Sequence, residues 1–468
     1  MSTQPKLSRK ILSIHRNATP PRMSYVCASA KPLYRYFLLL TLLLLRLPQT
    51  GYSQMSLSLS KAFEILEKQN PELLQANLTR LLAQQDYRDA KNALLPQVNM
   101  GVSHNYNLGL AFDQIAGQLV TGNKWSNTAN ANISVGTTIF QGFAKINNIR
   151  LAQLQLERED VSIAVKKKAL KLELLSYYFE ALTNTELYNA SKQQRDLSLA
   201  QLAQTRVEYD LGMKTTIDIS LIENQIANDE LRVLNSRSAI DERLLSIKEL
   251  LSIPLDDSIL LELPDITATI HDQIPTDTIH HTPEMQLAQL QTRTAELQIR
   301  MHKNAYFPTI QLSTGYGTNF SSERREPIGD GYMPFLDQVN QNKSLYLGLS
   351  LNIPILNGFR VRSNIVRATI NLEQAKVDQQ QTAINQRKTY KSAQQEYRTA
   401  LKQYQLYQKQ ASSTSASYDA MQERYDLGLT TAMDLAKALL DYNLSELNVI
   451  RAKYLLLYHQ EVLKILKE

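Results

Sequence analysis

Residues 131–143 read ANISVGTTIFQGF, and residues 347–359 read LGLSLNIPILNGF. In both stretches apolar residues alternate with small or polar ones, which is the period of a β-strand with one oily face. Both stretches end in Ile-x-x-Gly-Phe, and they lie 216 positions apart. They predict two equivalent strands, each followed by a tight turn.

Beyond an N-terminal extension, the chain of 468 residues consists of two internal repeats. Residues 209–212, Tyr-Asp-Leu-Gly, recur at 425–428 with the same offset of 216, and Asp218 matches Asp434. A repeat of this kind defines the architecture before any single motif does. The predicted domains are an N-terminal extension with a signal peptide (1–54), a first repeat (55–268) and a second repeat (269–468).

Four segments have the two-faced alternation of the opening stretches. They begin at Val98, Ala131, Ile310 and Leu345, and the alternation runs on to Phe112 in the first and Ile355 in the last. Each is at least as long as the 9–11 residues of a tilted membrane strand. An ordinary amphipathic sheet over a soluble core is the alternative, but four long strands with one pattern favour the membrane.

Helices surround these strands in both repeats. Residues 71–94 and 283–305 lack internal Gly and Pro and predict helices that Pro96 and Pro308 then end. A helix of about 100 Å is predicted for residues 144–210. Residues 390–425 carry the spacing 3, 4, 3, 4 of a coiled-coil seam. The seam consists of Tyr390, Ala393, Tyr397, Ala400, Tyr404, Tyr407, Ala411, Thr414, Tyr418, Met421 and Tyr425 in the second repeat, and includes Leu174, Tyr177, Ala181, Tyr188, Leu202 and Tyr209 in the first.

Gly212 and Gly428 mark tight reversals after the long helices. Return helices follow, predicted over residues 214–252 and 430–466. Helices with so narrow an apolar seam cannot bury a thick core, so we expect them to form the single-layer wall of a hollow cylinder.

The sheet constrains the assembly. Four strands in lipid leave two edges with unpaired backbone groups, which hydrocarbon does not tolerate, and four strands are too few to close a barrel. Three chains supply twelve strands, whose small polar faces then line a wet lumen. The predicted fold is α+β, a long antiparallel coiled-coil α-helical barrel plus a trimeric twelve-stranded transmembrane β-barrel.

The N-terminal segment explains the net charge of +6. Residues 1–54 contain eight Lys or Arg and no acid, and without them 43 basic residues face 45 acidic ones. The body therefore offers no general attraction for nucleic acid. The apolar run from Phe37 to Leu45 predicts a secretory signal, although a start at Met23 is an open alternative. Cys27 precedes this run, so a mature chain cleaved near Ser53 or Gln54 contains no cysteine.

No nucleotide-binding or hydrolase motif is present, which indicates that the chain is not an enzyme. His271, His280 and His281 cluster between the repeats and are better explained as a solvated linker than as a metal site. Residues 113–128 and 321–343 are predicted to be exposed loops between strands.

These features resemble the TolC family of outer-membrane efflux proteins, from about Leu57 to the C-terminus. The matching features are Leu-x-x-Ala followed by Asn70-Pro71, the helix-ending prolines, the Gly-Phe turns and the reversals at Gly212 and Gly428. The resemblance implies a homotrimer in the cell outer membrane, in contact with outer-membrane lipid and extending far into the periplasm. It implies a small-molecule duct without a cofactor, served by a periplasmic adaptor (membrane fusion protein) and an inner-membrane pump of the RND or ABC type.

The resemblance also implies roles for individual residues. Adaptor docking at the periplasmic tips would involve Tyr209, Leu211, Gly212, Thr215, Tyr425, Leu427, Gly428 and Thr431. The periplasmic gate would involve Asp218, Tyr425 and Asp434. The helix–strand junctions would be Pro96, Gly142, Phe143, Pro308, Gly358 and Phe359.

Departures from the family pattern leave alternatives open. Leu221 and Lys437 stand where a second acidic ring would need carboxylates, and Thr430 stands where a basic gate partner can occur. Asp218 and Asp434 can also be solvated carboxylates that favour a helix dipole. For the whole chain, the alternatives are the duct of a type I protein-secretion system and a soluble coiled-coil scaffold.

Overall fold

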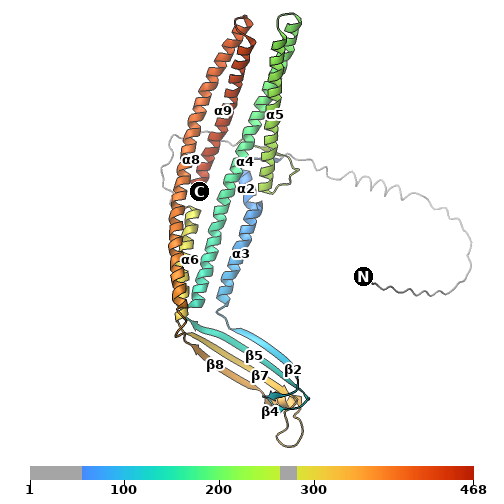
Figure 1. Cartoon of the computed structure of the whole chain (residues 1–468), viewed down its shortest axis with the longest axis vertical. Coiled ribbons are helices and arrows are strands. Elements are labelled where there is room, and N and C mark those ends of the chain that lie inside the picture. Colours follow the sequence, from blue (N-terminus) through green and yellow to red (C-terminus); the bar gives the residue numbers. More distant parts are fainter. Residues whose placement is uncertain (1–54, 264–281, 468) are drawn as a thin grey trace, which may run out of the picture. The chain divides into compact units, whose positions relative to one another are not determined.

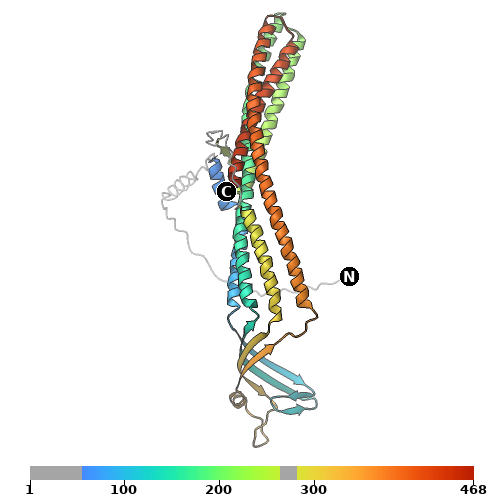
Figure 2. The same ribbon diagram turned by 90° about the vertical axis from the view of Figure 1, so that its left-hand side faces the viewer.

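A computed structural model describes residues 55–263 and 282–467 of the chain (Figures 1 and 2). The predicted signal segment and the histidines His271, His280 and His281 lie outside these ranges. In the described ranges no helix combines the length and the apolar character that crossing a membrane requires.

One antiparallel sheet joins the two halves of the chain. Its strand order is β2-β5-β7-β8. The strands are β2 (Gln97–Leu108), β5 (Trp125–Gln141), β7 (Thr309–Ser321) and β8 (Ser344–Asn352). β5 and β7 pair at the centre, so that a strand of the first half lies beside a strand of the second (Figure 1). Within the described residues β2 and β8 each pair on one side only.

The register of the sheet collects the oily residues on one face. Met100 pairs with Ile133, Ile133 with Tyr316, and Tyr316 with Leu345. Directly paired residues point to the same side of a sheet, so these four side chains share one face. Met100 is 74% exposed and Leu345 is 75% exposed, which means that the chain itself does not cover this face.

Two strands end earlier than the alternation predicts. β2 stops at Leu108 because Gly109 turns the chain with a φ of 103°. Phe112 belongs instead to β3 (Ala111–Asp113), which pairs with β4 (Gln118–Val120). β8 stops at Asn352 because Pro354, two residues later, has no N–H for a ladder. The loop predictions are wrong in part, because residues 113–128 contain β4 and the first residues of β5, from Trp125 onward, and residues 321–343 contain the short helix α7 (Phe335–Gln341).

The helices follow the predicted spans closely. The first half has α3 (Pro71–Asn92), α4 (Ala144–Asp210) and α5 (Thr216–Leu251), and the second has α6 (Pro283–Lys303), α8 (Arg360–Asp426) and α9 (Ala432–Lys467). α4 and α8 have 67 residues each. In the halves of α4 and α8 that lie next to the sheet, α3 packs on α4, and α6 packs on both α8 and α4. In their distal halves α5 packs on α4 and α9 on α8 (Figure 1).

The predicted Ala/Tyr seam is buried or half-buried along α8, but on α4 one of its residues is exposed. Tyr390, Ala393 and Tyr397 are buried, and Tyr418 is half-buried against Tyr442 of α9, with the two rings stacked at 5.8 Å between centroids. On α4 the prediction is wrong for Tyr209, whose side chain is exposed at the end of the helix.

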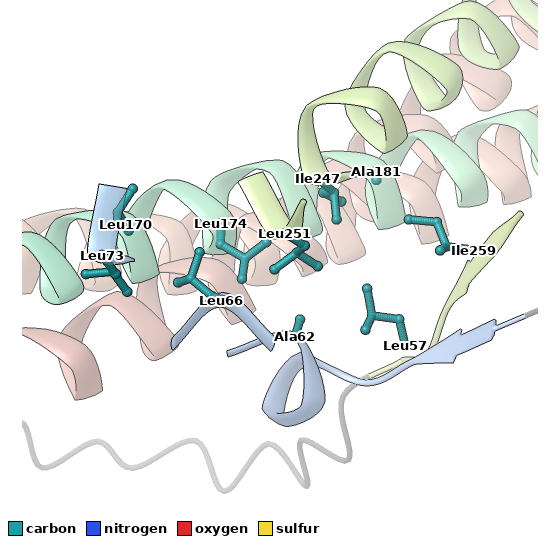
Figure 3. Packing of buried hydrophobic residues seen from close by; sticks show 10 residues of the cluster. All are labelled: Leu57, Ala62, Leu66, Leu73, Leu170, Leu174, Ala181, Ile247, Leu251 and Ile259. Atoms are coloured by element: carbon teal, nitrogen blue, oxygen red, sulfur yellow. The ribbon is translucent and has the colours of Figure 1, made fainter. Parts of the chain in front are cut away.

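A small core surrounds the middle of α4, which the narrow seam did not predict (Figure 3). It is built by α2 (Leu59–Gln69), by α5 and by the parallel pair β1 (Met55–Leu57) and β6 (Ile259–Leu261). Its fully buried residues include Leu66, Leu174 and Leu251. Beside it, the Tyr178 hydroxyl donates to the backbone oxygens of Leu57 (2.9 Å) and Glu262 (2.6 Å). Burial of Tyr178 raises the pKa of its hydroxyl, which therefore remains a donor at physiological pH.

Candidate functional site: the hairpin tips and the strand–helix junctions

The two hairpin tips reverse the chain in the same way. Gly212 and Gly428 have φ values of 75° and 70°, the left-handed region that favours glycine. The Gly212 N–H donates to the Tyr209 carbonyl (2.8 Å), and the Gly428 N–H donates to the Tyr425 carbonyl (2.9 Å). These bonds satisfy carbonyls that the end of a helix leaves unpaired. The residues predicted for docking thus form two closely similar turns.

Each return helix begins with a Thr–Asp cap. Thr215 and Asp218 form a reciprocal capping box at the start of α5. At the start of α9 the Thr431 hydroxyl donates to Asp434 Oδ2 (2.6 Å) and accepts from the Asp434 N–H (3.2 Å). Both carboxylates therefore have a structural role in the first turn of a helix.

Asp218 has in addition a partner on the other hairpin. The Tyr425 hydroxyl, at the end of α8, donates to Asp218 Oδ1 (3.4 Å). The Lys214 ammonium lies 3.8 Å from the centroid of the Tyr425 ring, and it also pairs with Glu208 (3.8 Å). The three groups Asp218, Tyr425 and Lys214 thus join the first hairpin to the second, and we call them the tip link.

The repeat-equivalent residues do not form such a link within one chain. In the described ranges Asp434 accepts hydrogen bonds only from the Thr430 hydroxyl and from the hydroxyl and backbone N–H of Thr431. Tyr209, the repeat equivalent of Tyr425, has an exposed side chain. Lys214 of the first tip lies on the ring of Tyr425, which belongs to the second hairpin. The repeat equivalent of Lys214 is Thr430, so the second tip has no cation at this position.

The electrostatics of both tips favour ionised carboxylates. Burial of Asp218 opposes ionisation, but hydrogen bonds from Thr215 and the charge of Lys214 outweigh it and hold the pKa of this carboxyl below 3.8. Hydrogen bonds from Thr431 and Thr430 lower the pKa of Asp434 in the same direction. Both groups therefore carry negative charge at physiological pH.

Exposed apolar side chains lie on both tips. They occupy repeat-equivalent positions and are 62–73% exposed, namely Leu211, Met213 and Ile217 in the first tip and Leu427, Leu429 and Met433 in the second. A single exposed leucine needs no explanation, but the same three positions exposed at each of two tips form a matched pair of apolar surfaces.

The strand–helix junctions also repeat their backbone. At Gly142-Phe143 and Gly358-Phe359 all four residues have φ between 56° and 66°. Their surroundings differ, because a Cβ on Gly142 would lie 2.6 Å from the Asn304 carbonyl oxygen, whereas one on Gly358 would have no atom within 4 Å. Pro96 and Pro308 stand directly before β2 and β7.

Two polar features escaped the sequence analysis. The first is Lys214, although its place opposite Thr430 in the repeat could have indicated it. The second is Asp229, which is fully buried between α4 and α5. It accepts hydrogen bonds from Ser198 (2.8 Å) and Gln225 (2.9 Å), and Arg232 lies 3.5 Å away. In the described ranges no three His, Cys, Asp or Glu residues are grouped to hold a metal ion. The tip groups join the two hairpins of one chain, and in the described residues they are not arranged as a nucleophile with a base.

Comparison with known proteins gives consistent matches. The family described as "Outer membrane efflux protein" matches residues 63–252 and 274–466. The chain is 23% identical over 428 residues to the outer membrane protein TolC of Escherichia coli (strain K12), covering 89% of this chain and 84% of that protein. Two solved structures share the fold. CusC has a TM-score of 0.74 at 14% identity, covering 87% of this chain and 91% of that one. The outer membrane protein VceC from Vibrio cholerae has a TM-score of 0.72 at 13% sequence identity, and the match covers 87% of this chain and 96% of that one.

Proposed function

Because the chain belongs to the outer membrane efflux protein family and is an outer-membrane efflux channel, we propose that it works as a homotrimeric duct for small molecules. In this proposal the sheets of three chains close a barrel in the outer membrane. The hairpins extend through the periplasm, where their tips receive an adaptor and an inner-membrane pump. Membership of this family contradicts the soluble-scaffold alternative.

The observation that carries the trimer is the sheet. Its apolar face is exposed in the single chain, and its edge strands β2 and β8 each pair on one side only within the described residues. Lipid can cover the apolar face but cannot satisfy the backbone groups of an edge. Pairing β2 of one copy with β8 of the next satisfies both edges, and three copies supply the twelve strands of a modest barrel.

The adaptor would dock on the apolar surfaces of the tips. Leu211 and Leu427 project from closely similar turns and are 70% and 73% exposed. A trimer presents six such tips, which a partner with repeated apolar pockets can grip. Burial of a leucine side chain contributes about 1.5–3 kcal/mol, so that a ring of six gives substantial binding even when each contact is partial.

Changing both leucines to aspartate tests the docking without disturbing the glycine turns. In cells whose drug resistance depends on this protein, Leu211→Asp with Leu427→Asp should abolish export, because each charge would have to be buried against an apolar partner. The matched control is Ile328→Asp, which places the same charge on a 90% exposed residue of the segment between β7 and β8. Normal resistance in the double variant, with trimers at wild-type level, would refute the docking assignment.

A further inference from the structure

The helix ends that border the sheet are strongly basic. Lys145 and Arg150 lie in the first eight residues of α4, Arg300 and Lys303 in the last turn of α6, and Arg360, Arg362 and Arg367 in the first eight residues of α8. We call these seven residues the junction cations. All except the half-buried Lys145 are exposed, and within the described residues none forms an ion pair.

Only one acidic residue, Glu296, lies near the junction cations on their own helices, four residues before Arg300 on α6. The first acidic residue of α4 is Glu157 and that of α8 is Glu373, and residues 297–303 of α6 contain none. The corresponding turns of α3 hold Asp86, Arg88, Asp89 and Lys91, which sum to zero. Seven junction cations less the one charge of Glu296 leave an excess of six positive charges per chain in the helix ends next to the sheet.

Assembly cannot remove this charge. Each copy brings the same excess of six positive charges. Pairing between identical chains rearranges ion pairs and leaves the sum unchanged. The compensating anions must come from outside the protein.

Two helix starts at this level also lack the usual cap. α4 and α8 begin without a side-chain hydrogen bond to their first N–H groups and without an acid in the first turn. By contrast, the starts of α2, α3, α5 and α6 are capped by Ser58, Asn70, Thr215 and Thr282. N–H groups without a side-chain acceptor and the positive end of the helix dipole favour an anion, and Lys145, Arg360 and Arg362 increase that preference.

An apolar belt separates these charges from the strands. Leu95, Phe143, Phe307, Ile355 and Phe359 lie in the connections between sheet and helices and are 46–95% exposed. Apolar and aromatic side chains followed by Lys and Arg are the order in which proteins cross from hydrocarbon to headgroups. The headgroup layer is about 5–8 Å thick on each side, which corresponds to roughly one to one and a half helical turns.

We propose that the junction cations and the uncapped starts of α4 and α8 bind the phosphate groups of anionic phospholipids, in the leaflet that borders the helices. This inference rests on the proposed placement of the sheet in the outer membrane. Arginine matches phosphate with two parallel hydrogen bonds, and basic residues at a membrane surface attract anionic lipid with about a fivefold gain in affinity each. The bound lipids form a ring that fixes the depth at which the duct sits.

The test compares two triple variants of α8. Arg360→Gln, Arg362→Gln and Arg367→Gln remove three junction cations. Arg387→Gln, Lys388→Gln and Lys391→Gln remove three exposed cations of the same helix, about 40 Å further from the sheet at 1.5 Å per residue. Each protein is reconstituted into vesicles of equal parts phosphatidylglycerol and phosphatidylcholine and extracted in mild detergent, and the retained lipids are counted by mass spectrometry.

We expect the wild type and the distal variant to retain phosphatidylglycerol in several-fold excess, and the junction variant to lose most of that excess. Equal retention of the two lipids by the wild type, or the same loss in both variants, would overturn the inference. Conductance of the wild type in a phosphatidylcholine bilayer is measured in parallel. A conducting channel without lipid preference refutes only this inference, whereas a lipid-selective protein that never conducts refutes the proposed function and leaves headgroup binding supported.

Discussion

At the scale of the residue, Asp218 and Asp434 have diverged in partners while keeping one role. Each caps the first turn of its helix through a threonine three residues earlier. Only Asp218 also meets a tyrosine from the other hairpin of the same chain. The carboxylate of Asp218 therefore connects the fold of one hairpin to the position of the next.

The two tip carboxylates, Asp218 and Asp434, lead us to expect that acid opens the channel. Their folded pKa values lie below the unfolded value of 3.8, so the stabilisation from the ionised groups is fully present above pH 3.8. It is lost as pH falls through the lowered values. We expect the open probability of single channels to stay constant from neutral pH to about pH 4 and to rise below that.

Asp218→Asn is the matched control for this titration, because it removes the titrating group that bridges the hairpins and should flatten the response. An opening transition centred near neutral pH would contradict the assignment, since neither carboxyl titrates there.

At the scale of the element, the two Gly-Phe junctions share a backbone and differ in what surrounds it. Gly142 lies against the end of α6, where the short 3₁₀ helix η1 (Asn304–Tyr306) precedes Phe307. The rings of Phe140, Phe143 and Phe307 meet edge to face with centroids 5.5–6.4 Å apart. The side chains of Asn147 and Asn304 are hydrogen-bonded beside them. The first junction is a packed joint, and the second is open.

The two glycines provide a matched pair of substitutions. Alanine at either position takes a left-handed φ, which costs about 1–2 kcal/mol. Gly142→Ala also drives a methyl group into the Asn304 carbonyl and Phe307, and overpacking of this kind costs about 1–3 kcal/mol more. We expect Gly142→Ala to lower the midpoint of thermal unfolding distinctly more than Gly358→Ala. Equal shifts would show that the close approach at Gly142 relaxes without cost.

The difference between these junctions marks where sequence reasoning stopped. Periodicity and the repeat predicted the strands, the long helices and both reversals, because each depends on neighbours in sequence. They did not distinguish Gly142 from Gly358, since the distinguishing atoms belong to residues 304 and 307. For the same reason Tyr425 and Asp218 were each selected, but not the contact between them. β1 and β6, with three residues each, are too short to carry a pattern.

At the scale of the whole molecule, the two ends of the long helices have opposite requirements. The sheet end needs fixed geometry, which the packed joint at Gly142 and the proposed lipid ring provide. The tip end needs geometry that can change, and there the hairpins are joined by one weak hydrogen bond and one cation–π contact. We infer that the duct is anchored at the sheet and opens at the tips.

The most direct test of the tip link is the single-channel conductance of the purified protein in a planar bilayer, compared between the wild type, Tyr425→Phe and Asp434→Ala. Tyr425→Phe removes only the hydroxyl that reaches Asp218 and keeps the ring beneath Lys214. Asp434→Ala removes a cap without breaking the tip link. We expect small conductance for the wild type, larger and more frequent openings for Tyr425→Phe, and a smaller change for Asp434→Ala. Trimers that never conduct, or a Tyr425→Phe channel that behaves like the wild type, would contradict a duct held closed by the tip link.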